Sequence, residues 1–341
     1  MNNKTLVLHA GPHKTGSTYL QYRLNKARGD LAAQSWSYPN YHVVNNSHVG
    51  VYSWLSGKGS GEDMEASFKN LVSEQNRWIL SCEDYIYLSK EKLLKLKSFL
   101  DGFNVQVVLY VRTPVDLWPS HWQELIRHGR DVTLLEYLAG HMRWTDALEP
   151  SIMNPFVQAN KFSNVFGRDS IRMFCYENVI ANGGDLFEHF WTHILGISET
   201  APYEAPRKIN ASQPAHKVEM LRCLNETHYN RFGVGPNLKV LKKYQTQQAR
   251  IEAMPEYEQF KNTLMENATV LRLNSNQELF RLRENMLLNN FGANIENKAS
   301  AKKLYEQEVF ERKISCAQRY WIDRFGLRPV VEGIYEQLQI A

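Results

Sequence analysis

Cysteine is scarce in this chain of 341 residues, and long hydrophobic runs are missing. The cysteines lie far apart, at Cys82, Cys175, Cys223 and Cys316. This spacing argues against a zinc site and against a disulfide scaffold, and it favours a reducing compartment. No stretch approaches the roughly 18 apolar residues of a membrane span, and the apolar segment before Gly11 is too short for a signal-peptide core. We therefore expect a cytoplasmic protein without a membrane span.

A strong net charge is missing as well. The chain has 40 basic and 36 acidic residues, which gives a formal net charge of +4. So small an excess does not indicate a partner such as nucleic acid, and any attraction for anions has to come from local clustering. Hydrophobic residues make up 43% and charged residues 22% of the chain, as is typical of a globular enzyme.

What is present is an alternation of short apolar runs and helical patterns. Four runs have the length and composition of buried strands, at residues 5–10, 77–82, 105–111 and 170–176. Amphipathic segments between them, such as SKEKLLKLKSFLDG, have helical spacing. This order predicts an α/β protein with a P-loop-like, three-layer fold, in which helices flank a central parallel sheet.

The second part of the chain has a different character. A Pro-rich connection, APYEAPRKINASQP, ends at Pro214, and the residues after it are rich in Leu, Glu, Lys, Arg and Asn, without a repeat. We expect a core at 1–214 and a largely helical C-terminal part at 215–341 that packs on the core.

The loop GPHKTGST follows the first predicted strand. Gly11 permits a tight turn, and Gly16 lets backbone N–H groups approach an anion. A helix that begins just after the loop directs its free N–H groups and its positive dipole end to the same point. Lys14 adds a charge, and Ser17 and Thr18 add hydroxyl groups. The pattern favours a phosphate-binding loop, although a Gly-rich turn can also be purely structural.

The position of the lysine distinguishes this loop from an NTP-binding Walker A loop, in which lysine directly follows the second glycine. Here Ser17 follows Gly16, and Lys14 precedes it. The pattern resembles the loop of sulfotransferases that use 3′-phosphoadenosine 5′-phosphosulfate (PAPS), in the form found in bacterial carbohydrate sulfotransferases. The resemblance implies that the loop binds the 5′-phosphosulfate through Gly11, Pro12, His13, Lys14, Thr15, Gly16, Ser17 and Thr18.

The same resemblance predicts a second motif, in which an arginine and a serine eight residues later hold the 3′-phosphate. VRTPVDLWPSHW supplies Arg112 and Ser120 at this spacing, directly after a predicted strand. A guanidinium at a strand end can bind a phosphate through two N–H groups. The alternative is a surface arginine that pairs with Asp116. Pro119 disturbs the helix expected here and with it the placement of Ser120.

The linker contributes a third set of candidates. RKINASQP resembles a segment that covers the nucleotide in related enzymes, and its candidates are Arg207, Asn210 and Ser212. A solvated loop without a binding role is the alternative.

Sulfuryl transfer to a hydroxyl requires in-line attack, a base and cations near the departing phosphate, and no metal is obligatory. Lys14 is the expected charge stabiliser. WILSCEDY places Glu83 just after a strand, and a glutamate at such a strand end takes the acceptor proton in the glycan sulfotransferases that the chain resembles. His13 is the rival base, whereas His9 lies within a strand and is expected to be a core residue.

Two other functions are compatible with these motifs. A P-loop kinase or NTPase would use Glu83 or Asp84 near Mg²⁺, although the displaced lysine argues against it. A protein that binds a nucleotide or a partner without catalysis is the other alternative. The sequence does not identify the acceptor, a glycan or another small molecule, or the oligomeric state.

Overall fold

The computed structural model describes most of the chain in two compact units. The described residues are 4–58, 62–74, 76–112, 114–142, 154–202, 213–274, 287, 289–291, 293–296, 311–319 and 321–339. The first unit, here called the sheet unit, combines Met1–Thr113, Asp146–Ile209 and Phe280–Gln307. The second, the helical unit, combines Pro114–Thr145, Asn210–Leu279 and Glu308–Ala341.

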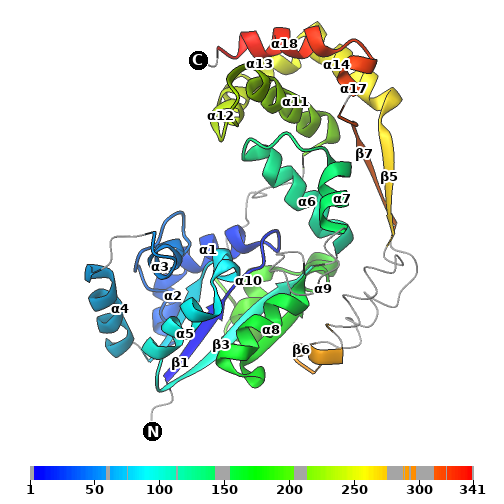
Figure 1. Ribbon diagram of the computed structural model, residues 1–341. Helices are drawn as coiled ribbons and strands as arrows, with labels where there is room; N and C mark the ends of the chain where they lie inside the picture. Colours follow the sequence, from blue (N-terminus) through cyan, green and yellow to red (C-terminus); the bar gives the residue numbers. More distant parts are fainter. Residues whose placement is uncertain are drawn as a thin grey trace. The chain divides into compact units, whose positions relative to one another are not determined.

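The sheet unit is built on five parallel strands in the order β2-β1-β3-β4-β6. Their bounds are β1 Lys4–His9, β2 Arg77–Ser81, β3 Phe103–Val111, β4 Ile171–Cys175 and β6 Ile295–Glu296. The central strands are aliphatic and buried on both faces, as a parallel sheet between helices requires. In Figure 1, β1 and β3 run side by side at the centre of this unit.

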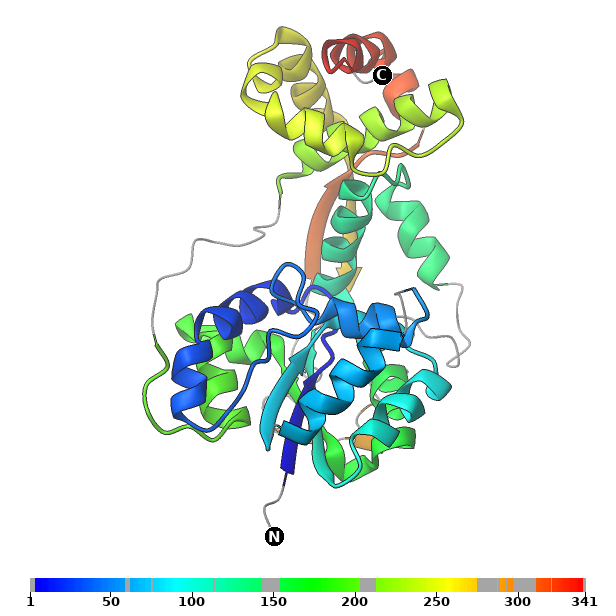
Figure 2. The same cartoon turned by 90° about the vertical axis from the view of Figure 1, so that its left-hand side faces the viewer.

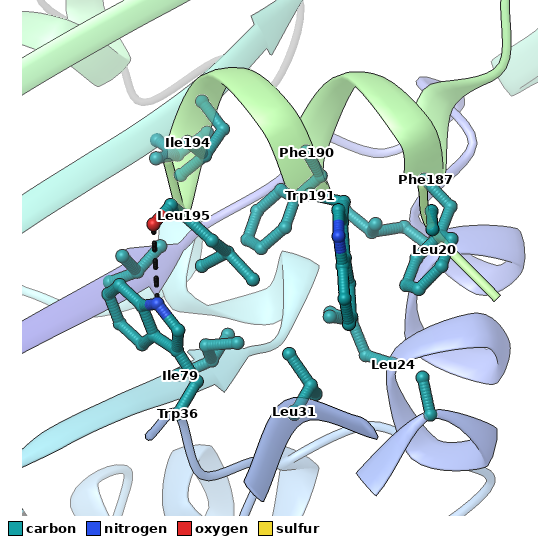
Figure 3. Close-up of a cluster of buried hydrophobic side chains, with 14 of the residues drawn as sticks. Leu20, Leu24, Leu31, Trp36, Ile79, Phe187, Phe190, Trp191, Ile194 and Leu195 are labelled. Carbon is teal, nitrogen blue, oxygen red and sulfur yellow. Dashed lines mark hydrogen bonds between the residues drawn. The ribbon is translucent and has the colours of Figure 1, made fainter. Parts of the chain in front are cut away.

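One face of the sheet is covered by helices from two distant parts of the sequence. They are α1 (Ser17–Lys26), α2 (Arg28–Ala33), α10 (Leu186–His189) and the π-helical turn η4 (Phe190–Ile194). Alternate residues of the strands, including Val7 and Ile79, pack with them in one buried cluster. Figure 3 shows Leu20 and Leu24 of α1 facing Trp191. There the indole Nε1 of Trp36 donates to the carbonyl oxygen of Leu195 over 3.3 Å.

The other side of the unit carries α5 (Lys90–Phe99) and α8 (Pro155–Phe166), which contact each other, and α8 also contacts β3 and β4. Ser89 caps α5, because its hydroxyl accepts the N–H of Lys92. The remaining elements are α3 (Val49–Leu55), α4 (Glu62–Glu74), η1 (Glu83–Tyr87), η2 (Arg168–Ser170), α9 (Tyr176–Ile180) and η3 (Ala181–Gly183).

The helical unit has α11 at its centre, in contact with helices and with a two-stranded antiparallel sheet of β5 and β7. Figure 2 gives a second view of these elements. The helices are α6 (Pro114–Arg127), α7 (Leu134–Met142), α11 (Ala215–Phe232), α12 (Lys239–Thr246), α13 (Gln248–Glu252), α14 (Pro255–Asn267), α17 (Trp321–Arg324) and α18 (Arg328–Gln337). The strands are β5 (Thr269–Asn274) and β7 (Glu311–Cys316).

Three charged side chains of α11 form a buried ionic cluster. Arg222 is fully buried, and its guanidinium donates to Glu219 over 2.6 Å and to Glu226 over 3.0 Å. The second oxygen of Glu219 accepts the backbone N–H of Ala317. Each charge therefore has a partner at hydrogen-bond distance, which a buried charge needs.

The predicted α/β fold is confirmed, and all four predicted strands are present with ends that differ by two residues at most. Among the described residues, β5, β6 and β7 are strands that the sequence did not predict. The two units do not divide the chain at a single point after residue 214. Residues 114–145 belong to the helical unit, and residues 280–307 belong to the sheet unit. No helix in the described part of the chain has the length and apolar character that crossing a bilayer requires.

Candidate functional site

The loop between β1 and α1 has an unusual backbone. Gly11, Lys14 and Gly16 have φ values of +81°, +66° and +78°. The left-handed region is open to glycine but costs a lysine roughly 1 kcal/mol or more. Two hydroxyls fix the turn from inside, since Thr15 Oγ1 donates to the carbonyl oxygen of Pro12 over 2.7 Å and Ser17 Oγ does so over 3.3 Å. A strained lysine held by such bonds marks a candidate functional loop.

At Gly11 and Gly16, neighbouring atoms leave little room for a Cβ, and the positive φ also favours glycine. A Cβ at Gly11 would lie 3.0 Å from Cβ of Glu83 and 3.1 Å from its Cα. A Cβ at Gly16 would lie 2.7 Å from Leu186 and 3.3 Å from the ring of Tyr176. The loop is therefore packed against the residue that follows β2 on one side and against α9 and α10 on the other.

The first turn of α1 has no acidic residue and no side-chain cap of its own. Gly16 is the N-cap residue. The free N–H groups and the helix dipole favour an anion at this end. Lys14, partly buried in the preceding loop, adds a full positive charge.

Arg112, at the end of β3, reaches the same loop. Its Nη1 donates to the carbonyl oxygen of Lys14 over 2.8 Å, although 98 residues separate the two in sequence. Its Nε lies 3.7 Å from Oε1 of Glu177, and its guanidinium lies 5.5 Å from the ring centre of Tyr176. These contacts hold the guanidinium beside the loop, so that two basic residues from different motifs meet at one edge of the sheet.

Two acidic residues follow β2 at this edge. Glu83 Oε2 accepts the side-chain N–H of Gln21 over 2.6 Å, and Gln21 is buried on α1. Asp84 Oδ1 lies 3.3 Å from Nε2 of His13 in the loop. The amide of Gln21 therefore orients Glu83 through a hydrogen bond, whereas His13 lies within ion-pair distance of a carboxylate.

The buried groups beneath this edge are held in their neutral forms. His9 is fully buried in β1 and bonds Ser81 through Nδ1, and burial lowers its pKa to about 3. Burial raises the thiol pKa of Cys82 and of Cys175 well above the ordinary value. His9 is thus the core residue predicted from the sequence, and burial favours the neutral thiol form of the two cysteines.

The structure brings most of the predicted site residues together, with differences in detail. Ser17 directs its hydroxyl hydrogen to the loop carbonyl of Pro12, and the Thr18 side chain is exposed. Ser120 lies in α6, in the helical unit, and α6 continues through Pro119. Arg207, Asn210 and Ser212 lie outside the described residues.

Three contributors were not predicted from the sequence. Gln21 and Glu177 contact Glu83 and Arg112, respectively. Lys161 of α8 donates to the carbonyl oxygen of Ile86, and so holds η1, which carries the two acidic residues. Burial lowers the pKa of Lys161 to about 8. Only Gln21 had a sequence signal, since it lies one helical turn after Ser17.

Comparisons of the chain with family models, with curated proteins and with solved structures give no match.

Proposed function

We propose that the chain is a PAPS-dependent sulfotransferase that acts on a hydroxyl group of a carbohydrate or another small acceptor. The observation that carries the proposal is the hydrogen bond from Arg112 to the carbonyl oxygen of Lys14. It joins the two motifs that resemble the two phosphate-binding segments of sulfotransferases. A cofactor with phosphate groups on the 3′ and 5′ oxygens of one ribose needs two such basic segments close together.

In the proposed reaction, the acceptor oxygen attacks sulfur in line with the bond to the 5′-phosphate. A new S–O bond forms, the old one breaks, and adenosine 3′,5′-bisphosphate leaves with the electron pair of that bond. Lys14 and the N–H groups of α1 would stabilise the charge that develops on the departing phosphate. Arg112 would bind the 3′-phosphate.

The acceptor proton has to pass to a base. We assign this role to Glu83, because its carboxylate is held by Gln21 and the residue lies just after Cys82, which follows the strand next to the loop. His13 remains the rival, because an imidazole oriented by a carboxylate, here Asp84, is a common arrangement for a general base.

Binding of adenosine 3′,5′-bisphosphate tests the proposal. Calorimetry on the purified chain should give a micromolar dissociation constant, with binding lost in Lys14→Ala and weakened in Arg112→Gln. Transfer of labelled sulfate from PAPS to a panel of sugars, lipids and phenols would then identify the acceptor. The absence of bisphosphate binding by the unmodified chain would exclude the proposal.

A P-loop kinase is the second candidate. It is favoured by the position of Glu83 and Asp84 after β2, where a carboxylate can bind Mg²⁺ near a phosphate loop. Binding of Mg·ATP in preference to the bisphosphate would support the kinase and reject the sulfotransferase. Intact biological activity in both Lys14→Ala and Glu83→Ala would instead indicate a protein that binds without catalysis.

A further inference from the structure

A second cationic site lies in the sheet unit, away from the loop. A cavity of about 710 Å³ opens beside the edge strand β2, between α2, residues 35–40 and the end of α4. It includes Arg77, the first residue of β2, whereas the loop packs against Glu83, beyond the last residue of that strand. A strand of this length separates its two ends by roughly 13 Å. The cavity is therefore distinct from the candidate active site.

The charged side chains that line the cavity are positive. Its described lining contains two arginines, Arg28 and Arg77, and no acidic side chain. The side chains of Ser35, Asn40 and Asn76 add hydroxyl and amide groups. Two guanidinium groups with neutral polar neighbours favour a ligand that carries two acidic groups and hydroxyl groups.

The two arginines are held in place by aromatic rings. The guanidinium of Arg77 lies 4.3 Å from the ring centre of Trp36, and that of Arg28 lies 5.7 Å from the ring centre of Tyr38. Residue 37, between the two rings, forms a parallel bridge with Trp78 of β2. Residues 36 and 38 therefore face the same way along an extended segment, and a step of roughly 7 Å separates them.

The rings themselves are fixed, so the arrangement is preorganised. Trp36 donates to the carbonyl oxygen of Leu195, as Figure 3 shows, and Tyr38 donates to the carbonyl oxygen of Asn46 over 2.6 Å. Both rings belong to the buried cluster of the sheet unit. Cations that stack on immobile rings lose less side-chain entropy when they bind an anion.

Arg28 has donors that the fold does not satisfy. Its Nε and Nη2 are shielded from solvent and have no hydrogen-bond partner, and desolvation lowers the pKa of its guanidinium. Two buried arginines, in contrast, have partners: Arg222 has two carboxylates, and Arg23 donates to Tyr19 and to the carbonyl oxygen of Pro202. Leaving guanidinium donors unpaired is costly, and an acidic ligand in the cavity would supply the missing counter-charge.

We propose that this cavity binds a sugar or sugar-like molecule with two acidic groups, such as phosphate, sulfate or carboxylate. The site is separate from the proposed sulfotransferase centre and does not depend on it. Two sources share this chemistry: a free sugar bisphosphate and an acidic oligosaccharide chain.

Calorimetry at low and fixed ionic strength tests the proposal with two probes, glucose 1,6-bisphosphate and a disulfated disaccharide. The unmodified chain should bind at least one of them. Arg28→Gln and Arg77→Gln should each weaken binding by about tenfold or more, because each removes a charge-assisted contact. Preference for the bisphosphate identifies a free metabolite as the ligand, and preference for the disaccharide identifies a glycan chain.

Two controls separate this site from other effects. Arg168→Gln removes an exposed arginine of the same unit that also stacks on a ring, that of Phe291, and should leave binding unchanged. Lys14→Ala should abolish binding of adenosine 3′,5′-bisphosphate and leave the sugar probes unaffected. If neither probe binds, or if Arg168→Gln weakens binding as much as Arg77→Gln, the proposal is wrong.

Discussion

The side chain of Gln21 on α1 donates a hydrogen bond of 2.6 Å to the carboxylate of Glu83, at the end of the neighbouring strand. The bond crosses from the helix that begins at the candidate anion-binding loop to the residue proposed as the base. It fixes the carboxylate relative to that loop, and precise placement of reacting groups contributes strongly to rate.

The first prediction concerns Gln21 as a positioning residue. Gln21→Ala should lower kcat by about 10-fold or more while KM for PAPS stays near the original value, because the base is misplaced and the phosphate loop is intact. Steady-state kinetics measures the two effects separately. Lys26→Ala, an exposed position on the same helix, is the control and should have normal kinetics. A rise in KM with unchanged kcat would assign Gln21 to binding instead.

The second prediction decides between the two candidate bases. Glu83→Gln keeps the size of the side chain and removes its ability to take a proton, so kcat should fall by about 10²- to 10⁴-fold. Binding of adenosine 3′,5′-bisphosphate should remain. His13→Asn should lower kcat much less. If His13→Asn has the larger effect, the base is His13 with Asp84 as its orienting partner.

The third prediction separates the stability of the loop from its function. Lys14→Gly and Lys14→Ala both remove the charge, and both should abolish bisphosphate binding. Only glycine adopts the observed φ of +66° without steric cost, so Lys14→Gly should be the more stable of the two by about 1 kcal/mol. Chemical denaturation measures the difference. Equal stabilities would mean that residue 14 leaves the left-handed region in solution.

The fourth prediction concerns the ionic cluster in α11. Glu219→Ala leaves the buried Arg222 with one carboxylate instead of two and also removes the acceptor of the Ala317 N–H. The free energy of unfolding should fall by about 3 kcal/mol or more. Glu336→Ala, which breaks an exposed pair with Arg231, should cost about 0.5 kcal/mol or less. Similar losses in both variants would contradict the assigned role of burial.

The fifth prediction is a loss of stability at mildly acidic pH. Burial lowers the pKa of His9 to about 3 and that of His48 to about 4, whereas an unfolded histidine has a pKa of about 6.5. Between these values the unfolded chain binds more protons than the folded chain, so stability falls as the pH falls below about 6.5. Each histidine contributes a slope of up to about 1.4 kcal/mol per pH unit.

Denaturation between pH 5 and pH 7 measures this slope. His48→Asn should reduce it, because the substitution removes one of the titrating groups. His42→Asn is the control, since His42 is exposed and should leave the slope unchanged. A slope that His48→Asn does not alter would show that other groups determine the acid sensitivity.

The sequence was sufficient to predict four of the five strands of the parallel sheet, because these four read as apolar runs. It was insufficient for β6, which has only two residues, and for β5 and β7. Their pairing joins Thr269 to Cys316 across a long stretch of polar sequence, and neither segment has the apolar character of a central strand. Membership of 114–145 in the helical unit depends on packing against α11, which local patterns do not encode.

The candidate site also contains residues that the sequence predicted and residues that it did not. Gly11, Gly16 and Lys14 were identified because each has a local backbone or charge requirement that the motif displays. Gln21 was missed because its role depends on which strand end the helix faces. Arg28 and Arg77 had no signal, since single arginines 49 positions apart become neighbours of one cavity only through the fold.

Three residues of the short helix α1 form hydrogen bonds with different parts of the sheet unit. Ser17 donates to the carbonyl oxygen of Pro12 in the loop, Gln21 donates to Glu83, and Arg23 donates to the carbonyl oxygen of Pro202. One additional residue in this helix would rotate every later side chain by about 100° relative to Ser17. Substitutions on the exposed side of α1 should therefore be tolerated, whereas an insertion or deletion within the helix would separate Ser17 from the contacts with Glu83 and Pro202 in a single step.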